Sequence, residues 1–331
     1  MTRGTGQHRD LAADHRVHPL HRPAAGPIAV LPEPKRQFVD AVLAGGGTVE
    51  PLSARTTGIV WLSETRADEL AVVLEANPGI QWVQLPWAGV DAFGDVLARW
   101  SDKPFPLWTS AKGAYSEPVA EHALALTLAL LRRFPQKTLA GRWVEKTGTS
   151  LYGLSVVIVG AGGIARELIR LLSLFEVEIT VVRRSGEPVE GAAKTVAPGA
   201  LSELLPRADV VVLAAASTDE TARLIGAPEF AMMKSSAVLV NIARGALVDT
   251  DALVDALHKG VIAGAGLDVT DPEPLPDGHP LWSEPNVLIT SHSADTPEMT
   301  APLLASRIRL NVAALHSGDG FVGVVDPKAG Y

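Results

Sequence analysis

The sequence predicts an α/β protein with two doubly wound parallel sheets, the second inserted into a discontinuous first domain. Short apolar runs between residues 28 and 85 alternate with helix-like stretches, as strands buried on both faces do. A second series of apolar runs extends from about residue 155 to residue 290, with room for a crossover helix between successive runs. A last helix-like segment, 300–316, follows the final run and is expected to return to the first sheet.

These patterns set the expected domain boundaries. We expect a disordered tail at 1–26, a first domain from 27–118 and 298–331, and a second domain at 119–297. The tail carries His15, His18 and His21 three residues apart. A metal site needs a rigid frame with supporting hydrogen bonds, so a solvated tail is the favoured interpretation and no metal site is expected.

Composition excludes several classes of function. The 331-residue chain has 47% hydrophobic and 20% charged residues, the balance of a folded protein with room for two cores. Its net charge of −8 argues against nucleic-acid binding. The absence of cysteine excludes disulfides and thiolate chemistry and suits a reducing cytoplasm, the expected location. No apolar run has the length of a membrane span, so no membrane association is expected; the run at 123–131 predicts a buried helix.

The sharpest local motif is VVIVGAGGIARELIRLLSLF at 156–175, which fits the pattern G-x-G-x-x-A. Gly160 permits a tight turn, Gly162 lets the backbone approach a pyrophosphate, and Ala165 lets the following helix lie close to the strand. Gly163 and Ile164 open that helix, whose free amides favour phosphate, and we expect both to contact a dinucleotide. The alternative is a glycine-rich turn without a ligand. The apolar face expected to be buried comprises Ile164, Leu168, Leu171, Leu172 and Phe175.

The next predicted strand ends in VVRRSG, where such units usually carry an acidic residue for the adenosine ribose. Arg183 and Arg184 stand there instead, followed by Ser185. Guanidinium and hydroxyl groups can donate hydrogen bonds to a 2′-phosphate, which a carboxylate would repel. The stretch therefore predicts a preference for NADP(H), with NAD(H) also possible. The alternative is a pair of solvated arginines.

Three later segments, 239–253, 265–276 and 288–298, each place polar residues just past an apolar run, where open α/β sheets bind ligands. With these motifs the sequence resembles the D-isomer-specific 2-hydroxyacid dehydrogenases, from about residue 27 to about residue 325. The resemblance implies a Rossmann cofactor domain inserted into a flavodoxin-like substrate domain. It also implies a homodimer.

The resemblance assigns roles to three residues. Arg244, in NIARGALVD, would bind the substrate carboxylate, Glu273, in LDVTDPEP, would support the catalytic histidine, and His292, in TSHSA, would be the general acid and base. Proline more often precedes that histidine in the family, where this chain has Ser291. Each residue also has a structural alternative, as an ion-pair partner, a turn carboxylate or a hydrogen-bonded strand-end histidine.

Further residues follow from the same resemblance. Ala243 and Asp268 are expected to contact the cofactor, Asp268 near the nicotinamide carboxamide. The loop QLPWAGVD is expected to bind substrate through the four residues Trp87, Ala88, Gly89 and Val90, with Trp87 either lining the pocket or belonging to the core. Glu121 and His122, on the predicted helix after residue 116, are expected to make interhelix or dimer contacts.

Chemistry supports the same assignment. Reducing a 2-oxo acid requires a fixed cation for the carboxylate, a hydride donor and a proton donor. Arginine presents a fork that matches a carboxylate, histidine exchanges protons near neutrality, and a neighbouring glutamate orients the ring. We therefore expect an NADP(H)-dependent 2-hydroxyacid dehydrogenase that reduces a small 2-oxo acid such as glyoxylate or hydroxypyruvate. The alternatives are a phosphoglycerate dehydrogenase-like enzyme and a non-catalytic, dinucleotide-sensing corepressor-like protein.

Overall fold

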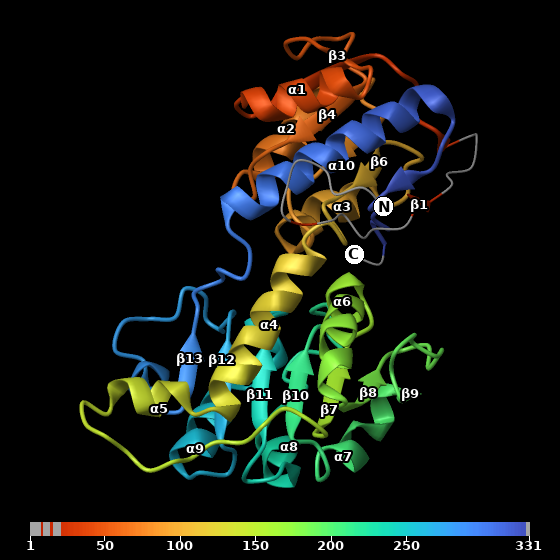
Figure 1. Cartoon of the computed structure of the whole chain (residues 1–331). Coiled ribbons are helices and arrows are strands. Elements are labelled where there is room, and N and C mark those ends of the chain that lie inside the picture. Colours follow the sequence, from red (N-terminus) through yellow and green to blue (C-terminus); the bar gives the residue numbers. More distant parts are fainter. Residues whose placement is uncertain (1–7, 9–13, 16–20, 329–331) are drawn as a thin grey trace. The chain divides into compact units, whose positions relative to one another are not determined.

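The computed structural model describes residues 8, 14–15 and 21–328, which form two compact units (Figure 1). The discontinuous unit comprises Met1–Tyr115 with Pro297–Tyr331, and the inserted unit comprises Ser116–Thr296. The chain thus passes between units at Tyr115/Ser116 and Thr296/Pro297, a few residues from the boundaries expected from the sequence. Within the described part of the chain, no helix combines the length and apolarity needed to cross a membrane.

The discontinuous unit contains a five-stranded parallel sheet in the order β3-β2-β4-β5-β6. This order is the flavodoxin-like one, in which the chain winds outward in both directions from its first strand. The strands are β2 (Pro27–Leu31), β3 (Thr48–Val49), β4 (Gly58–Trp61), β5 (Trp82–Gln84) and β6 (Leu107–Thr109). Both β4 and β5 are buried along their whole length, because helices cover both faces of a parallel sheet.

Helices of the discontinuous unit come from both ends of the chain. They are α1 (Arg36–Ala44), α2 (Ala67–Ala76), the short η2 (Asp91–Phe93), α3 (Gly94–Trp100) and α10 (Pro297–Ser317). The first and last of these, α1 and α10, pack side by side (Figure 1). Residues 1–7, 9–13 and 16–20 of the predicted tail, including His18, lie outside the described residues. Within the predicted tail, β1 (Asp14–His15) pairs with β14 (Phe321–Val322). Disorder of the tail stays a prediction.

A buried polar network joins α10 to this sheet. Gln84, Thr109 and Asn311 are all at most 1% exposed. Asn311 Nδ2 donates to Gln84 Oε1 (2.9 Å) and to the Val322 carbonyl (3.0 Å), and its own Oδ1 accepts from Val322 N (2.7 Å). Since buried amides are costly when unpaired, this network fixes the register of the C-terminal segment on the sheet.

The inserted unit contains a seven-stranded sheet in the order β13-β12-β11-β10-β7-β8-β9, with every neighbouring pair parallel. This is the Rossmann order, which reverses between β7 and β10, so the doubly wound sheets predicted from the sequence are confirmed. The strands are β7 (Ser155–Val159), β8 (Glu178–Val182), β9 (Lys194–Val196), β10 (Val210–Leu213), β11 (Val238–Asn241), β12 (Gly264–Leu267) and β13 (Val287–Ile289).

Helices α4 and α6 lie side by side over this sheet (Figure 1). The α-helices are α4 (Ser116–Leu131), α5 (Phe134–Leu139), α6 (Gly163–Leu172), α7 (Leu201–Leu204), α8 (Ala227–Met232) and α9 (Thr250–His258). Single turns occur at η3 (Ser173–Phe175), η4 (Pro198–Ala200), η5 (Gly245–Leu247) and η6 (Pro280–Ser283). The predicted helix at 123–131 is the C-terminal half of α4, and it is largely buried as expected.

Candidate active site

The glycine turn after β7 lies where the strand order reverses. Gly160 has φ +111°, a conformation that residues with a side chain rarely adopt, and a methyl group there would overlap the carbonyl of Ala214, which follows β10. Gly160 is therefore required by its turn and by the close approach of the neighbouring loop. Ala165, the third small residue of the motif, is fully buried, which allows α6 to lie close to the sheet.

Gly162 differs, because an added methyl group would meet no protein atom within 4 Å. Its φ of −72° is also open to any residue. The protein alone therefore gives no reason for glycine at this position. Gly162 is the N-cap residue of α6 and offers no side-chain hydrogen bond to the first amides of the helix. These amides, which favour a phosphate, therefore adjoin the open space at Gly162. A dinucleotide pyrophosphate fits this combination.

The buried face of α6 differs in part from the one predicted. Leu168 and Leu172 are buried as expected. Ile169 is buried too, although the predicted pattern omitted it. The other three residues expected on the face, Ile164, Leu171 and Phe175, are only half-buried. For Phe175 the reason is that the helix ends at Leu172 and this residue belongs to the following turn.

Arg183 directly follows β8, as predicted, and its backbone N–H donates to the Val196 carbonyl at 2.9 Å. Its side chain is 24% exposed and lies 3.7 Å from the carboxylate of Glu187, measured from Nη2 to Oε2. The Ser185 hydroxyl donates to the same Glu187 oxygen at 3.5 Å. Two of the three groups predicted to meet a 2′-phosphate thus face a carboxylate of their own loop, which the sequence interpretation missed.

Arg244 follows β11, and Asn241 at the end of that strand shapes its loop. Asn241 is 1% exposed; its Nδ2 donates to the Arg244 carbonyl (2.9 Å) and its Oδ1 accepts from Ala243 N (3.1 Å). The Arg244 guanidinium donates to the Ala243 carbonyl (2.7 Å) and is half-buried. The sequence interpretation singled out Ala243 and Arg244 but missed Asn241, whose side-chain amide hydrogen-bonds to the backbone of both residues.

The loops after β11 and β12 are in direct contact. Any side chain at Gly245 would overlap the backbone of Thr270, so glycine is required for this approach. Thr270 N in turn donates to Glu273 Oε2 at 3.3 Å. The segment that carries Arg244 therefore packs against the segment that carries Glu273.

Glu273 and His292 form a direct pair, with 2.7 Å between Oε1 and Nδ1. They lie 19 residues apart in sequence, after β12 and β13 respectively, and the parallel strands bring them to the same edge of the sheet. A carboxylate at Nδ1 fixes the ring orientation and leaves Nε2 for proton exchange with a ligand. This is the arrangement of an acid–base histidine with its supporting carboxylate.

Asp268 organises the loop that carries His292. Its side chain is 2% exposed, and its two carboxylate oxygens accept from Ser293 N (2.8 Å) and Ala294 N (3.2 Å). Its backbone carbonyl accepts from His292 N (2.6 Å). The observed contacts of Asp268 are therefore with the loop that carries His292, while contact with a cofactor stays a prediction.

His122, on α4, contacts the loop after β13 and Asp268 after β12, while the interhelix or dimer contact expected from the sequence stays a prediction. Its Nε2 lies 2.9 Å from the Thr290 hydroxyl and 3.5 Å from Asp268 Oδ1. Its neighbour Glu121 is exposed. A partner 168 residues away cannot be found from helical spacing, so this contact emerges only from the fold.

The loop predicted to bind the substrate carboxylate belongs to the discontinuous unit and follows β5. Trp87 is half-buried, and its ring meets that of Tyr115 edge to face with centroids 6.1 Å apart. Ala88 and Gly89 are also half-buried, whereas Val90 is only 3% exposed. Contact of this loop with a substrate stays a prediction.

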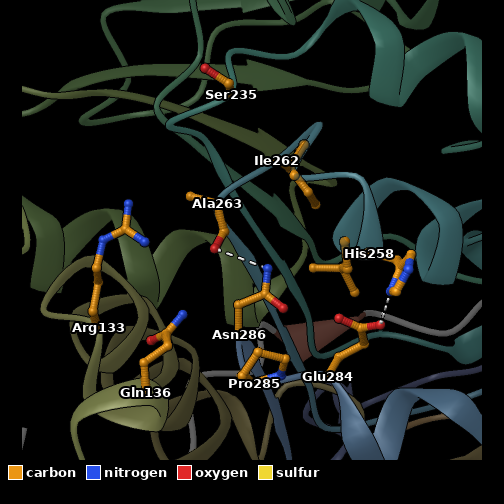
Figure 2. A pocket seen from close by; sticks show the side chains of 11 residues that line it. Arg133, Gln136, Ser235, His258, Ile262, Ala263, Glu284, Pro285 and Asn286 are labelled. Carbon is orange, nitrogen blue, oxygen red and sulfur yellow. Dashed lines mark hydrogen bonds and ion pairs between the residues drawn. The ribbon is translucent and has the colours of Figure 1, made fainter.

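A cavity of about 480 Å³ in the inserted unit lies at the opposite edge of its sheet (Figure 2). Ser235, Ala263 and Asn286, which line it, precede β11, β12 and β13, whereas the candidate catalytic residues follow strands. The His258–Glu284 pair forms part of its wall, with 3.3 Å between Nδ1 and Oε1. This cavity is separate from the candidate active site. Among the residues described, no group of three or more His, Asp or Glu side chains is placed to hold a metal ion.

Fold and site together define a class: a pyridine nucleotide-dependent oxidoreductase with a histidine–glutamate pair. Comparison with known proteins gives the family, because residues 124–294 match the model of the NAD binding domain of D-isomer specific 2-hydroxyacid dehydrogenases. The chain belongs to this family, whose members act on the CH–OH group of 2-hydroxy acids with NAD(P). The resemblance noted in the sequence is thereby confirmed.

Individual relatives cover most of the chain. A Corynebacterium melassecola protein described as "Uncharacterized protein in proB 3'region" is 39% identical over 88% of this chain and 95% of its own length. Glyoxylate/hydroxypyruvate reductase B of Escherichia fergusonii is 34% identical over 83% and 86%. Among solved structures, a D-isomer specific 2-hydroxyacid dehydrogenase from Xanthobacter autotrophicus, in complex with NADPH and MES, is 27% identical with a TM-score of 0.78, covering 93% of this chain and 100% of that one.

Proposed function

We propose that the protein is an NADPH-dependent reductase of small 2-oxo acids, with glyoxylate or hydroxypyruvate as substrate. The observation that carries the proposal is the 2.7 Å contact between His292 Nδ1 and Glu273 Oε1 at the carboxyl edge of a Rossmann sheet. The named relatives support the substrate class, since they include a glyoxylate/hydroxypyruvate reductase. The inserted unit would serve as the cofactor domain and the discontinuous unit as the substrate domain.

The cofactor would be held by the glycine turn and the loop after β8. Open space at Gly162, next to the uncapped N-terminus of α6, fits a pyrophosphate; Gly163 and Ile164 open that helix. When bound, the reduced nicotinamide supplies the hydride for the carbonyl carbon of the substrate. Ala243 is a further candidate for contact with the cofactor.

The protein's own residues perform the remaining steps. Arg244 holds the substrate carboxylate with its guanidinium fork, and the backbone of the loop 87–90 contributes further hydrogen bonds. His292 Nε2 gives its proton to the carbonyl oxygen as the new C–H bond forms, leaving a 2-hydroxy acid and a neutral imidazole. Glu273 keeps the ring in place through its hydrogen bond with Nδ1.

Preference for NADPH over NADH is proposed from Arg183, Arg184 and Ser185. Arginine at the end of the second Rossmann strand can bind a 2′-phosphate, where an acidic residue would bind the ribose of NADH. A related structure supports this: a glyoxylate/hydroxypyruvate reductase from Sinorhizobium meliloti, 26% identical with a TM-score of 0.72 over 92% of this chain and 98% of that one, is described as NADPH-dependent and holds NADP.

Initial rates with NADPH or NADH and a panel of glyoxylate, hydroxypyruvate, pyruvate and 3-phosphohydroxypyruvate test the proposal. We expect turnover with glyoxylate or hydroxypyruvate, faster with NADPH, and a ~10²–10⁴-fold lower kcat in His292→Ala, as for a lost general acid. Absence of turnover with every acid would point to a non-catalytic dinucleotide sensor. Dominant activity on the phosphorylated acid would favour a phosphoglycerate dehydrogenase, and native turnover in His292→Ala would refute the mechanism.

We also propose a homodimer located in the cytoplasm. The segment from α5 onward exposes Phe134 (53%), Leu139 (77%) and Trp143 (96%), a concentration of large apolar side chains that a second copy would cover. Analytical ultracentrifugation should give twice the monomer mass, and Trp143→Ser should weaken the dimer. A monomeric native protein would refute this part of the proposal.

A further inference from the structure

The loop that presents His292 has an unusual backbone. Ser291 and His292 have φ values of 49° and 53°, in the left-handed region that non-glycine residues rarely adopt. Proline, which the family more often carries at position 291, cannot reach such a φ, because its ring fixes φ near about −65°. A loop of this kind persists only where its surroundings hold it in place.

Asp268 holds this loop in place through direct hydrogen bonds. Backbone amides of three consecutive residues, His292, Ser293 and Ala294, donate to it at 2.6, 2.8 and 3.2 Å. The last two reach the carboxylate, so the orientation of the Asp268 side chain controls the path of the loop. At 2% exposure the carboxylate depends on protein donors to hold that orientation.

Thr290 and His122 fix the carboxylate in turn. The Thr290 hydroxyl donates to Asp268 Oδ1 at 2.7 Å. Because a hydroxyl has only one hydrogen, its contact with His122 Nε2 at 2.9 Å requires the histidine to donate. The chain of hydrogen bonds therefore runs from His122 on α4 through Thr290 to Asp268, and from there to the backbone of His292. All of these residues belong to the inserted unit.

We propose that His122 and Thr290 are positioning residues for His292, a role that rests on the proposed function of His292 as general acid and base. Helix α4 packs on β11 and β12, so it offers a rigid support for the strand-end loop. The His292–Glu273 contact of 2.7 Å needs the ring held to within a fraction of an ångström, and small displacements of a proton donor lower the rate.

Two pairs of variants test the role in catalysis. His122→Phe keeps a ring but removes the donor, and Thr290→Val keeps the shape but removes the hydroxyl. Each should lower kcat about three- to tenfold, the effect of one lost hydrogen bond, and leave the KM for the 2-oxo acid and the Kd for NADPH near native. His122→Gln, which restores an N–H donor, and Thr290→Ser should recover most of the rate. Glu121→Gln, on the neighbouring exposed position, is the matched control and should behave as native.

Coupling and hydrogen exchange distinguish positioning from general destabilisation. The double variant His122→Phe with Thr290→Val should lose no more activity than the worse single variant, because both break one chain of hydrogen bonds. In His122→Phe the amides of Ser293 and Ala294 should exchange about tenfold faster, while those of β7 keep native protection.

Native kcat in His122→Phe, additive losses in the double variant, or faster exchange throughout the sheet would each overturn the inference. Failure of the proposed function is recognised separately, by native turnover in His292→Ala. The exchange measurement needs no activity, so it tests the contact with the loop in either case.

Discussion

Glu187 opposes the binding of the cofactor that its own loop is predicted to select. Its carboxylate lies 3.7 Å from Arg183 Nη2 and accepts from Ser185, so a 2′-phosphate must displace it and is repelled by it. Because Glu187 is 74% exposed, the pair itself contributes at most about 1 kcal/mol. Repulsion between unit charges about 4 Å apart in water is of the same size. We therefore expect Glu187→Gln to favour NADPH binding by about 1 kcal/mol, or about fivefold in Kd.

Fluorescence titration with NADPH and NADH measures this effect. The Kd for NADH should stay near native, because NADH lacks the 2′-phosphate, and the NADPH gain should shrink as ionic strength rises. Glu190→Gln, which removes an exposed carboxylate three residues away, is the control for net charge. In an Arg183→Ala background the gain should be smaller. An equal gain in both glutamine variants, or equal native affinities for NADPH and NADH, would refute this account of the loop.

Four other substitutions test the remaining site. Glu273→Gln should lower kcat in single-turnover measurements and leave the NADPH Kd near native, because the carboxylate holds the His292 ring through Nδ1 at 2.7 Å; native kcat would remove Glu273 from the mechanism. Arg244→Ala should raise the substrate KM and lower kcat with the NADPH Kd unchanged, and weaker NADPH binding would argue against a carboxylate clamp. Gly160→Ala should lower the free energy of unfolding in urea by about 3 kcal/mol, through strain at positive φ and overlap with a carbonyl. Gly162→Ala should leave that free energy nearly unchanged yet weaken NADPH binding, and the reverse pattern would exclude a pyrophosphate at Gly162.

Much of this architecture was predictable because its determinants are local. Apolar runs of strand length, separated by helix-length segments, predict a parallel sheet, and the G-x-G-x-x-A turn marks the first strand of the Rossmann unit. Once the strands are parallel, polar residues just past their ends must gather at one edge. The pairing of Glu273 with His292 was implied by the family resemblance, and the parallel strands explain why the two residues meet.

The supporting residues were not predictable in this way, because their roles depend on tertiary contacts. His122 was expected to make an interhelix or dimer contact, and nothing near it in sequence indicates Thr290 as its partner. In the sequence Asn241 is only the last residue of a predicted strand, although its side-chain amide hydrogen-bonds to the backbone of Ala243 and Arg244. Glu187 stands four residues after Arg183, yet only the turn between them decides that the two side chains meet.

The discontinuous unit also imposes an order of events during synthesis. Its sheet is complete in sequence at β6, but Asn311, whose Nδ2 donates to Gln84 Oε1, is added by the ribosome only after the whole inserted unit. At about 5–20 residues per second the inserted unit delays this partner by about 10 to 40 s. During that interval Gln84 already has the Leu85 carbonyl and Thr109 Oγ1 as partners, but the N-terminal half still exposes the apolar surface that α10 later covers. The inserted unit already has all of its strands. The discontinuous unit is therefore the last of the two to complete its core.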